Sequence, residues 1–172
     1  MSRTRVRPPG FDEVVQLPQA LQREVPPEYL DANDHMNVQY YLVLGSLGLE
    51  LRFGQLGLGV HNIPELGQTQ FVAEHHLRYH AELRAGTPIS VHTRLLDRSD
   101  RALHAMAFLL DRTNNRLAFT MELVAVQVDV ATRRATAFPP RVEESIDRAL
   151  AEDAALGWPA PVSGVMGIRR SD

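Results

Sequence analysis

Residues 38–56 place the strongest constraint on the fold, because they read as one long helix that is apolar on nearly every side. No proline interrupts the chain from Val38 until Pro64. A helix that is apolar all round has to be buried, since it offers no polar stripe to water. One sheet can cover such a helix only by curving around it, or with the help of a second subunit. Its apolar members are Tyr40, Tyr41, Leu42, Val43, Leu44, Leu47, Leu49, Leu51, Phe53 and Leu56.

The segments that follow the helix have the patterns of strands. Residues 71–84 alternate between apolar and polar side chains, with breaks only at Val72 and His75, which favours a strand. Residues 89–96, 103–110 and 117–128 are apolar runs separated by short polar turns, as in an antiparallel meander. A short strand is also expected before the helix, over residues 21–25, where Pro26 and Pro27 end it.

The assignment of residues 71–84 decides what two histidines can do. On a helix, His76 and His80 would lie one turn apart and could share a metal ion. On a strand they would be about 13 Å apart at the usual rise per residue, which is too far for one ion. The alternation favours the strand, so we expect a plain polar strand face and no metal site.

These elements predict an α+β protein with the hot-dog fold, a curved antiparallel sheet wrapped around one long buried helix. We expect an N-terminal arm over residues 1–18, a single domain over 19–156 and an irregular tail over 157–172. A last amphipathic helix opens at Pro139 and Pro140. Hot-dog subunits usually pair so that their sheets become continuous, which predicts a homodimer or a dimer of dimers.

The composition removes several chemistries. The 172 residues include no cysteine, and all 18 basic residues are arginine. A thiol nucleophile, a cysteine-bound metal, a lysine Schiff base and a P-loop lysine are therefore excluded. The net charge of -3 gives no basic field for nucleic acid or a membrane surface. The basic start runs into prolines and acids rather than an apolar segment, so a cytoplasmic location is expected.

A dense group of polar side chains stands directly before the long helix. Its members are Asp31, Asn33, Asp34, His35 and Asn37. A helix N-terminus offers unpaired amides that can stabilise a carbonyl oxygen as it becomes negative during acyl transfer. A carboxylate and an imidazole beside it could act as base or nucleophile. The structural alternative is an N-cap at Asn33 or Asp34 and a hydrogen-bonded turn at His35.

The run Asp31-Ala-Asn-Asp-His35-Met-Asn37-Val-Gln-Tyr-Tyr41 resembles the active-site signature of hot-dog acyl-CoA thioesterases of the 4-hydroxybenzoyl-CoA thioesterase type. The runs 74–79, 101–104 and 128–134 resemble those of the branch with betainyl-CoA thioesterases and the thioesterase-like domains of some carnitine dehydrogenases. This resemblance implies an enzyme that hydrolyses a small or medium acyl-CoA to the free acid and CoA, without a metal or cofactor.

The resemblance also implies roles for single residues. Asp31 matches the catalytic carboxylate, which would activate water or attack the thioester carbonyl itself. His35 and Asn37 match the part of the motif that shapes and polarises the carbonyl site. The residues expected to contact the substrate are Asn33, Asp34, Val38, Tyr41 and His76.

One position departs from the family pattern, because Asp34 stands where most members have glycine. Its carboxylate could narrow the pocket, favour a cationic acyl group or raise the pKa of Asp31 through like charge. It could equally accompany a loss of activity.

Two other functions stay open on the sequence. One is a dehydratase or hydratase that places His35 and Asp31 across an enoyl or hydroxyacyl thioester, and the other is a non-catalytic acyl-thioester binder. A CoA substrate needs cations for its phosphates, and quaternary ammonium groups favour aromatic faces. The candidate cations are Arg84, Arg98, Arg101, Arg112, Arg133 and Arg134, and the candidate aromatic residues are Tyr40, Tyr41, Phe53, Tyr79 and Trp158.

Overall fold

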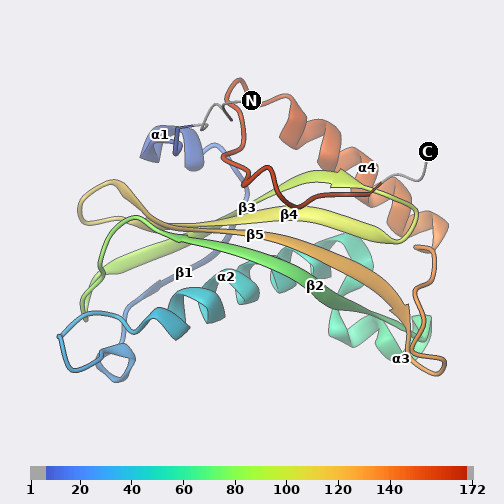
Figure 1. Cartoon of the computed structure of the whole chain (residues 1–172), viewed down its shortest axis with the longest axis horizontal. Coiled ribbons are helices and arrows are strands. Elements are labelled where there is room, and N and C mark those ends of the chain that lie inside the picture. Colours follow the sequence, from blue (N-terminus) through green and yellow to red (C-terminus); the bar gives the residue numbers. More distant parts are fainter. Residues whose placement is uncertain (1–6, 170–172) are drawn as a thin grey trace.

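The fold is built on one antiparallel sheet, in a computed structural model that describes residues 7–169. The five strands lie in the order β1-β3-β4-β5-β2, so β1 and β2 form the two edges (Figure 1). Their bounds are β1 Gln19–Glu24, β2 Gln68–Tyr79, β3 Pro88–Arg98, β4 Ala102–Asp111 and β5 Arg116–Asp129. The expected strands are confirmed, except that β2 ends at Tyr79 rather than at residue 84.

The early end of β2 has a local cause. The amides of His80 and Ala81 both donate to the carbonyl of Ala118, so the paired ladder ends there. Residues 80–87 then form a loop that turns into β3, with Gly86 in a left-handed conformation (φ 77°). The middle of this loop lies beside the start of the long helix, since the N–H of Met36 donates to the carbonyl of Leu83.

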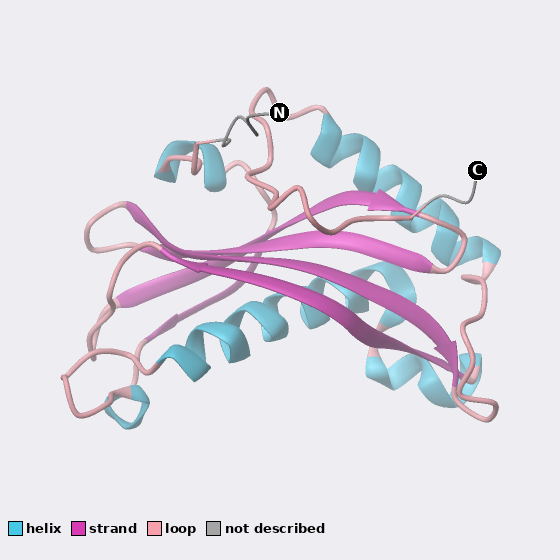
Figure 2. Ribbon diagram, in the orientation of Figure 1, coloured by secondary structure: helices cyan, strands magenta, loops and turns pink. Residues whose placement is uncertain are grey.

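The long helix α2 (Val38–Phe53) runs along one face of the sheet (Figure 2). It continues through a π-helical turn, η2 (Gly54–Leu58), and the short helices η3 (Val60–Asn62) and α3 (Ile63–Leu66). Gly48 lets the helix lie close to the sheet, because a Cβ at this position would overlap Cγ1 of Val91. No helix within residues 7–169 is long and apolar enough to cross a membrane.

The expectation that α2 is buried on every side is wrong for a single chain. Its sheet-facing side is buried, with Leu44 and Leu49 at 0% and 2% exposed. On the other side Val43 is 50% exposed and Leu51 is 41% exposed. The sheet curves over only part of the helix, so the remaining apolar side is left uncovered within one subunit.

The opposite face of the sheet is covered by the two ends of the chain. The short helix α1 (Phe11–Val14) and the irregular residues 155–169 lie over it (Figures 1 and 2). The helix α4 (Pro140–Ala154) instead runs beside β3 and packs against η2, so its buried residues Val142, Ile146 and Ala149 join the core cluster of α2. Trp158 packs edge-on against Phe108 of β4, and Val14 and Leu17 complete this second apolar cluster.

A buried carboxylate fastens the C-terminal residues to this outer face. Oε1 of Glu122 lies 2.8 Å from Nε2 of His104, and Oε2 accepts the backbone N–H of Ser163 at 2.7 Å. Both side chains are buried in β-strands of the sheet. The whole arrangement is α+β, with a curved antiparallel sheet against one long helix, which confirms the hot-dog fold.

Candidate functional site

The polar residues before α2 form a tight loop held by its own backbone. The N–H of Asp31 donates to the carbonyl of His35 at 2.9 Å, and the N–H of Asp34 donates to the carbonyl of Asp31 at 3.1 Å. Oδ1 of Asp31 also accepts the N–H of Asn33 at 2.8 Å. These bonds bring Asp31 and His35 to the same end of α2, as the sequence predicts.

The helix cap differs from the expectation. Asn37 is the N-cap of α2, since its Oδ1 accepts the N–H of Gln39 at 3.1 Å. The prediction that Asn33 or Asp34 caps the helix is wrong, because the loop closes on itself before the helix begins. The amide of Asn37 in turn donates to the carbonyl of Tyr29 at 2.9 Å, which ties the cap to the preceding 3-10 turn, η1 (Pro27–Tyr29).

Asp34 occupies a left-handed backbone conformation, with φ of 59°. Glycine adopts this region without penalty, and Asp and Asn tolerate it better than most other residues. The left-handed backbone therefore explains why most family members have glycine at this position. The Asp34 side chain is exposed on the loop, and within the chain it does not narrow a pocket.

His35 meets two residues that the sequence did not single out together. Its Nε2 lies 3.0 Å from Oε2 of Glu82 and 3.3 Å from Nη2 of Arg84. Both partners come from the loop that follows β2. The same loop holds the site loop through its backbone, because the N–H of Met36 donates to the carbonyl of Leu83 at 2.7 Å.

Of the two expected substrate contacts on α2, one is exposed and one is buried. Val38 opens the helix and is 61% exposed. Tyr41 is 3% exposed, and its hydroxyl donates to the carbonyl of Ala81 at 3.1 Å. Burial raises the pKa of the Tyr41 phenol above its usual value. Within this chain Tyr41 is a core residue that joins α2 to the loop after β2.

His76 lies on the far side of the sheet from this loop. It pairs in register with Glu122 of β5, whose carboxylate faces the C-terminal residues. Tyr79, three residues along, packs against Tyr41 on the helix side, and three steps along a strand reverse the face. The structure therefore does not bring His76 together with Asp31 in the same chain.

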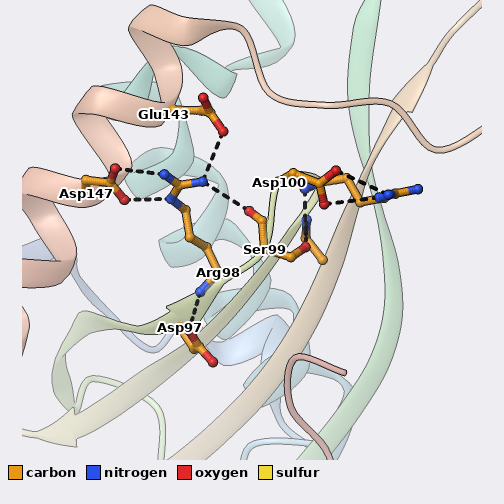
Figure 3. A network of polar contacts seen from close by, with 8 residues as sticks. Asp97, Arg98, Ser99, Asp100, Glu143 and Asp147 are labelled. Atoms are coloured by element: carbon orange, nitrogen blue, oxygen red, sulfur yellow. Dashed lines mark hydrogen bonds and ion pairs between the residues drawn. The ribbon is translucent and has the colours of Figure 1, made fainter. Parts of the chain in front are cut away.

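Among the candidate arginines, Arg84 is the one that contacts the loop of residues 31–37. Arg98 instead binds α4, with a two-point contact to Asp147 at 2.6 and 2.7 Å and a bond to Glu143 at 3.0 Å (Figure 3). Arg101 pairs with its neighbour Asp100 at 3.2 Å. Arg98 and Arg101 are thus engaged at the other end of the sheet.

A stacked pair of tyrosines flanks the same loop. The rings of Tyr29 and Tyr40 are parallel within 6°, with centroids 3.8 Å apart. The guanidinium of Arg23 lies 5.6 Å from the Tyr29 ring. Of the other candidate aromatic residues, Phe53 and Trp158 are buried in the two apolar clusters. Tyr29 was not among the candidates, because its place beside Tyr40 depends on the loop geometry.

A groove opens between α2 and the edge strand β2, about three turns beyond the helix cap. Its volume is about 270 Å³, and its walls are mainly apolar, including Leu49, Phe53, Val72 and Leu123. Glu50 and Gln70 are polar members of its lining.

Within residues 7–169, no group of three His, Asp or Glu side chains is placed to hold a metal ion.

The curved sheet, the central helix and the polar loop at its N-terminus together define a hot-dog protein of the thioesterase class. The chain belongs to the thioesterase-like superfamily, whose sequence profile matches residues 25–146. This membership confirms the resemblance seen in the sequence, and at the level of the family it supports a thioester hydrolase.

Individual relatives are similar over most of the chain. A betainyl-CoA thioesterase of Pseudomonas aeruginosa is 27% identical over 143 residues, which are 83% of this chain and 89% of that protein. An L-carnitine dehydrogenase/betainyl-CoA thioesterase of Agrobacterium fabrum is 28% identical over 82% of this chain and 28% of its own length. A Staphylococcus aureus protein solved in complex with CoA superposes with a TM-score of 0.79 at 25% identity, covering 89% of this chain and 97% of that one.

Proposed function

We propose that this chain is an acyl-CoA thioesterase that hydrolyses a small or medium acyl-CoA, with Asp31 as general base or nucleophile. The observation that carries the proposal is the placement of Asp31 in a backbone-closed loop at the start of α2. Of the two carboxylate oxygens of Asp31, only Oδ1 has a hydrogen-bond partner among the described residues. The second carboxylate oxygen therefore stays free for a water molecule or the thioester carbon.

The reaction needs a base or nucleophile, donors for the carbonyl oxygen, and a route for the proton. Water adds across the thioester bond, the C–S bond breaks, and the products are the free acid and the CoA thiol. The Gln39 and Tyr40 amides are already bonded to Asn37, so the Val38 amide is the first helix amide that could hold the carbonyl oxygen. The His35 imidazole is the second group that could move a proton here.

The surroundings of the loop support a substrate with an anionic CoA part and a cationic acyl part. Arg84 at the loop could bind a phosphate through its planar fork. The Tyr29–Tyr40 stack places aromatic rings beside the loop, and such rings attract cations, as the Arg23 guanidinium over Tyr29 already shows. The named function of the relatives, betainyl-CoA hydrolysis, involves such an acyl group. CoA chemistry of this kind fits a cytoplasmic protein.

A second copy of the chain would cover the uncovered side of α2, so we also propose a homodimer. The outer edge of β2 has no partner strand within the described chain, and Phe71 and Val72 are 39% and 53% exposed along it. Val72 points to the helix side of the sheet, opposite Ala125 of β5, and together with Val43 and Leu51 of α2 it forms an apolar α2–β2 face. Exposed edge strands readily pair with another chain, and a pair of β2 strands would make the two sheets continuous.

A panel of thioesters tests the function. We expect purified protein to release free thiol from betainyl-CoA or from another member of a panel with acetyl-, hexanoyl- and benzoyl-CoA. Hydration of crotonyl-CoA, followed by its absorbance, would point to the hydratase alternative instead. Tight CoA binding with no turnover of any thioester would point to the non-catalytic binder.

A further inference from the structure

The imidazole of His35 faces one acceptor and one donor at the same nitrogen. Nε2 lies 3.0 Å from Oε2 of Glu82 and 3.3 Å from Nη2 of Arg84. A neutral imidazole nitrogen either donates or accepts, and a guanidinium can only donate. Nε2 therefore cannot form both hydrogen bonds, and its protonation decides which neighbour it binds.

The arrangement with the proton on Nε2 satisfies more of these groups. Nε2–H then donates to Glu82 over the shorter distance, and a carboxylate acceptor makes the stronger, charge-assisted bond. Nη2 of Arg84 turns to Oε1 of Glu82, which lies 3.5 Å away. In the reverse arrangement, Oε2 of Glu82 and the lone pair of Nε2 would face each other without a proton. This arrangement leaves Nδ1 as the nitrogen of His35 that can accept a proton.

The backbone on both sides of Glu82 is fixed by hydrogen bonds to the start of the helix region. The carbonyl of Ala81 accepts the hydroxyl of Tyr41, and the carbonyl of Leu83 accepts the N–H of Met36. Both flanking residues are thus fastened to the start of α2 or to the loop before it. The carboxylate of Glu82 reaches His35 from a loop whose backbone is hydrogen-bonded on both sides of Glu82.

We propose that Glu82 is a positioning residue, which orients the His35 ring and keeps its proton on Nε2 so that Nδ1 serves as the proton acceptor of the site. The proposal rests on the proposed function for its catalytic meaning, whereas the tautomer itself does not depend on any substrate. Arg84 also contacts the carboxylate of Glu82. If the Glu82 side chain were removed, Arg84 would be the remaining partner of Nε2 among the described residues.

Imidazole nitrogen NMR tests the tautomer without substrate. In ¹⁵N-histidine-labelled protein at mildly alkaline pH, we expect the neutral ring of His35 to carry its proton on Nε2. His35→Asn identifies its signals. Glu82→Gln keeps an acceptor oxygen and should keep this tautomer. Glu82→Leu leaves only the donor Arg84 and should move the proton to Nδ1. An unchanged tautomer in Glu82→Leu, or a wild-type proton on Nδ1, would overturn the proposal.

Kinetics with betainyl-CoA tests the consequence. We expect Glu82→Leu to lower kcat roughly tenfold, which is less than the hundredfold or more that a proton-transferring group itself contributes, because Glu82 only positions that group. KM should be nearly unchanged, and Glu82→Gln should lie in between. The matched control is Glu28→Gln, an exposed glutamate in η1 whose side chain has no bond among the described residues. A normal kcat in Glu82→Leu would overturn the positioning role. Absence of turnover in the wild-type protein would instead count against the proposed function. The NMR experiment would still decide the tautomer of His35, because it uses no substrate.

Discussion

The backbone N–H of Asp31 donates to the carbonyl oxygen of His35 across 2.9 Å, which closes the loop at the entrance to α2. This bond places a carboxylate and an imidazole together by main-chain geometry rather than by side-chain contacts. The side chain of Asp31 adds only one bond to the loop, from the N–H of Asn33 to Oδ1. Asparagine keeps an oxygen at that position, so the charge can be removed with little effect on the loop.

We predict that Asp34→Gly leaves both folding and thioester hydrolysis essentially intact. The left-handed backbone at Asp34 suits glycine, and its exposed carboxylate has no role in the proposed reaction. Asp34→Val should lower the free energy of unfolding by about 1–2 kcal/mol, because a branched Cβ is strained there. Urea denaturation measures the stability of both variants, and thiol release measures the activity of Asp34→Gly. A strong gain of activity in Asp34→Gly would show that aspartate impairs this site.

The close approach of α2 to β3 predicts unequal effects at two helix glycines. A Cβ at Gly48 would overlap Cγ1 of Val91, whereas one at Gly45 would lie no closer than 3.2 Å to the end of Met121 and 3.3 Å to the ring of Phe119. We expect Gly48→Ala to reduce the free energy of unfolding by about 2 kcal/mol through overpacking. Gly45→Ala is the matched control and should change it by less than about 1 kcal/mol, helped by the better helix propensity of alanine. Equal effects in urea denaturation would contradict the packing of α2.

Glu122 should make stability depend on acid pH. Burial disfavours its charged form, but the hydrogen bonds from His104 and Ser163 outweigh burial, and its pKa lies below the usual value. The native state thus binds the proton more weakly than the unfolded chain, so its contribution is present above about pH 4.3 and is lost as the pH falls through the lowered pKa. Glu122→Gln should lower the free energy of unfolding by about 2 kcal/mol at neutral pH and flatten its acid dependence.

The control for Glu122 is Glu28→Gln, which removes an exposed carboxyl elsewhere on the chain. It should keep both the neutral stability and the acid slope of the wild type. Denaturant unfolding at several values between about pH 7 and pH 3 reads both quantities. A Glu122→Gln protein with the wild-type acid slope would show that this carboxylate does not fasten the C-terminal residues.

The α2–β2 face predicts the oligomeric state. We expect the protein to be at least a dimer in solution by light scattering, and Val43→Glu with Val72→Glu to produce monomers. Both positions are half-exposed in one chain, so the charges should leave the subunit folded. Val165→Glu, at an exposed apolar residue of the C-terminal segment, is the control and should not change the mass. A wild-type monomer would contradict the proposed dimer.

The fold was largely predictable because its signals are repetitive along the chain. The apolar run of α2 and the alternation in β2 are each spread over a dozen or more residues. The contacts between individual side chains at the site could not be predicted in the same way. Glu82 reaches His35 only because β2 ends early at Tyr79 and its loop returns to the start of α2.

The differences between the expected and the observed arrangement of the site have equally local causes. Asn37 rather than Asp34 caps the helix, because the left-handed turn at Asp34 closes the loop before the helix starts. His76 is separated from the loop because the strand turns it to the outer face, opposite Glu122. A sequence motif shows which side chains are present near an element, but the backbone decides which of them meet.

The most direct test of the proposed function compares Asp31→Asn with Asp34→Asn in the hydrolysis of betainyl-CoA, read as free thiol released. Both variants lose one exposed or half-exposed carboxylate from the same loop, and both should unfold at the wild-type urea concentration. We predict that Asp31→Asn loses activity by roughly a hundredfold or more, within the range that base and nucleophile removal produces, while Asp34→Asn keeps most of it. Full activity in Asp31→Asn would contradict the central role of this carboxylate.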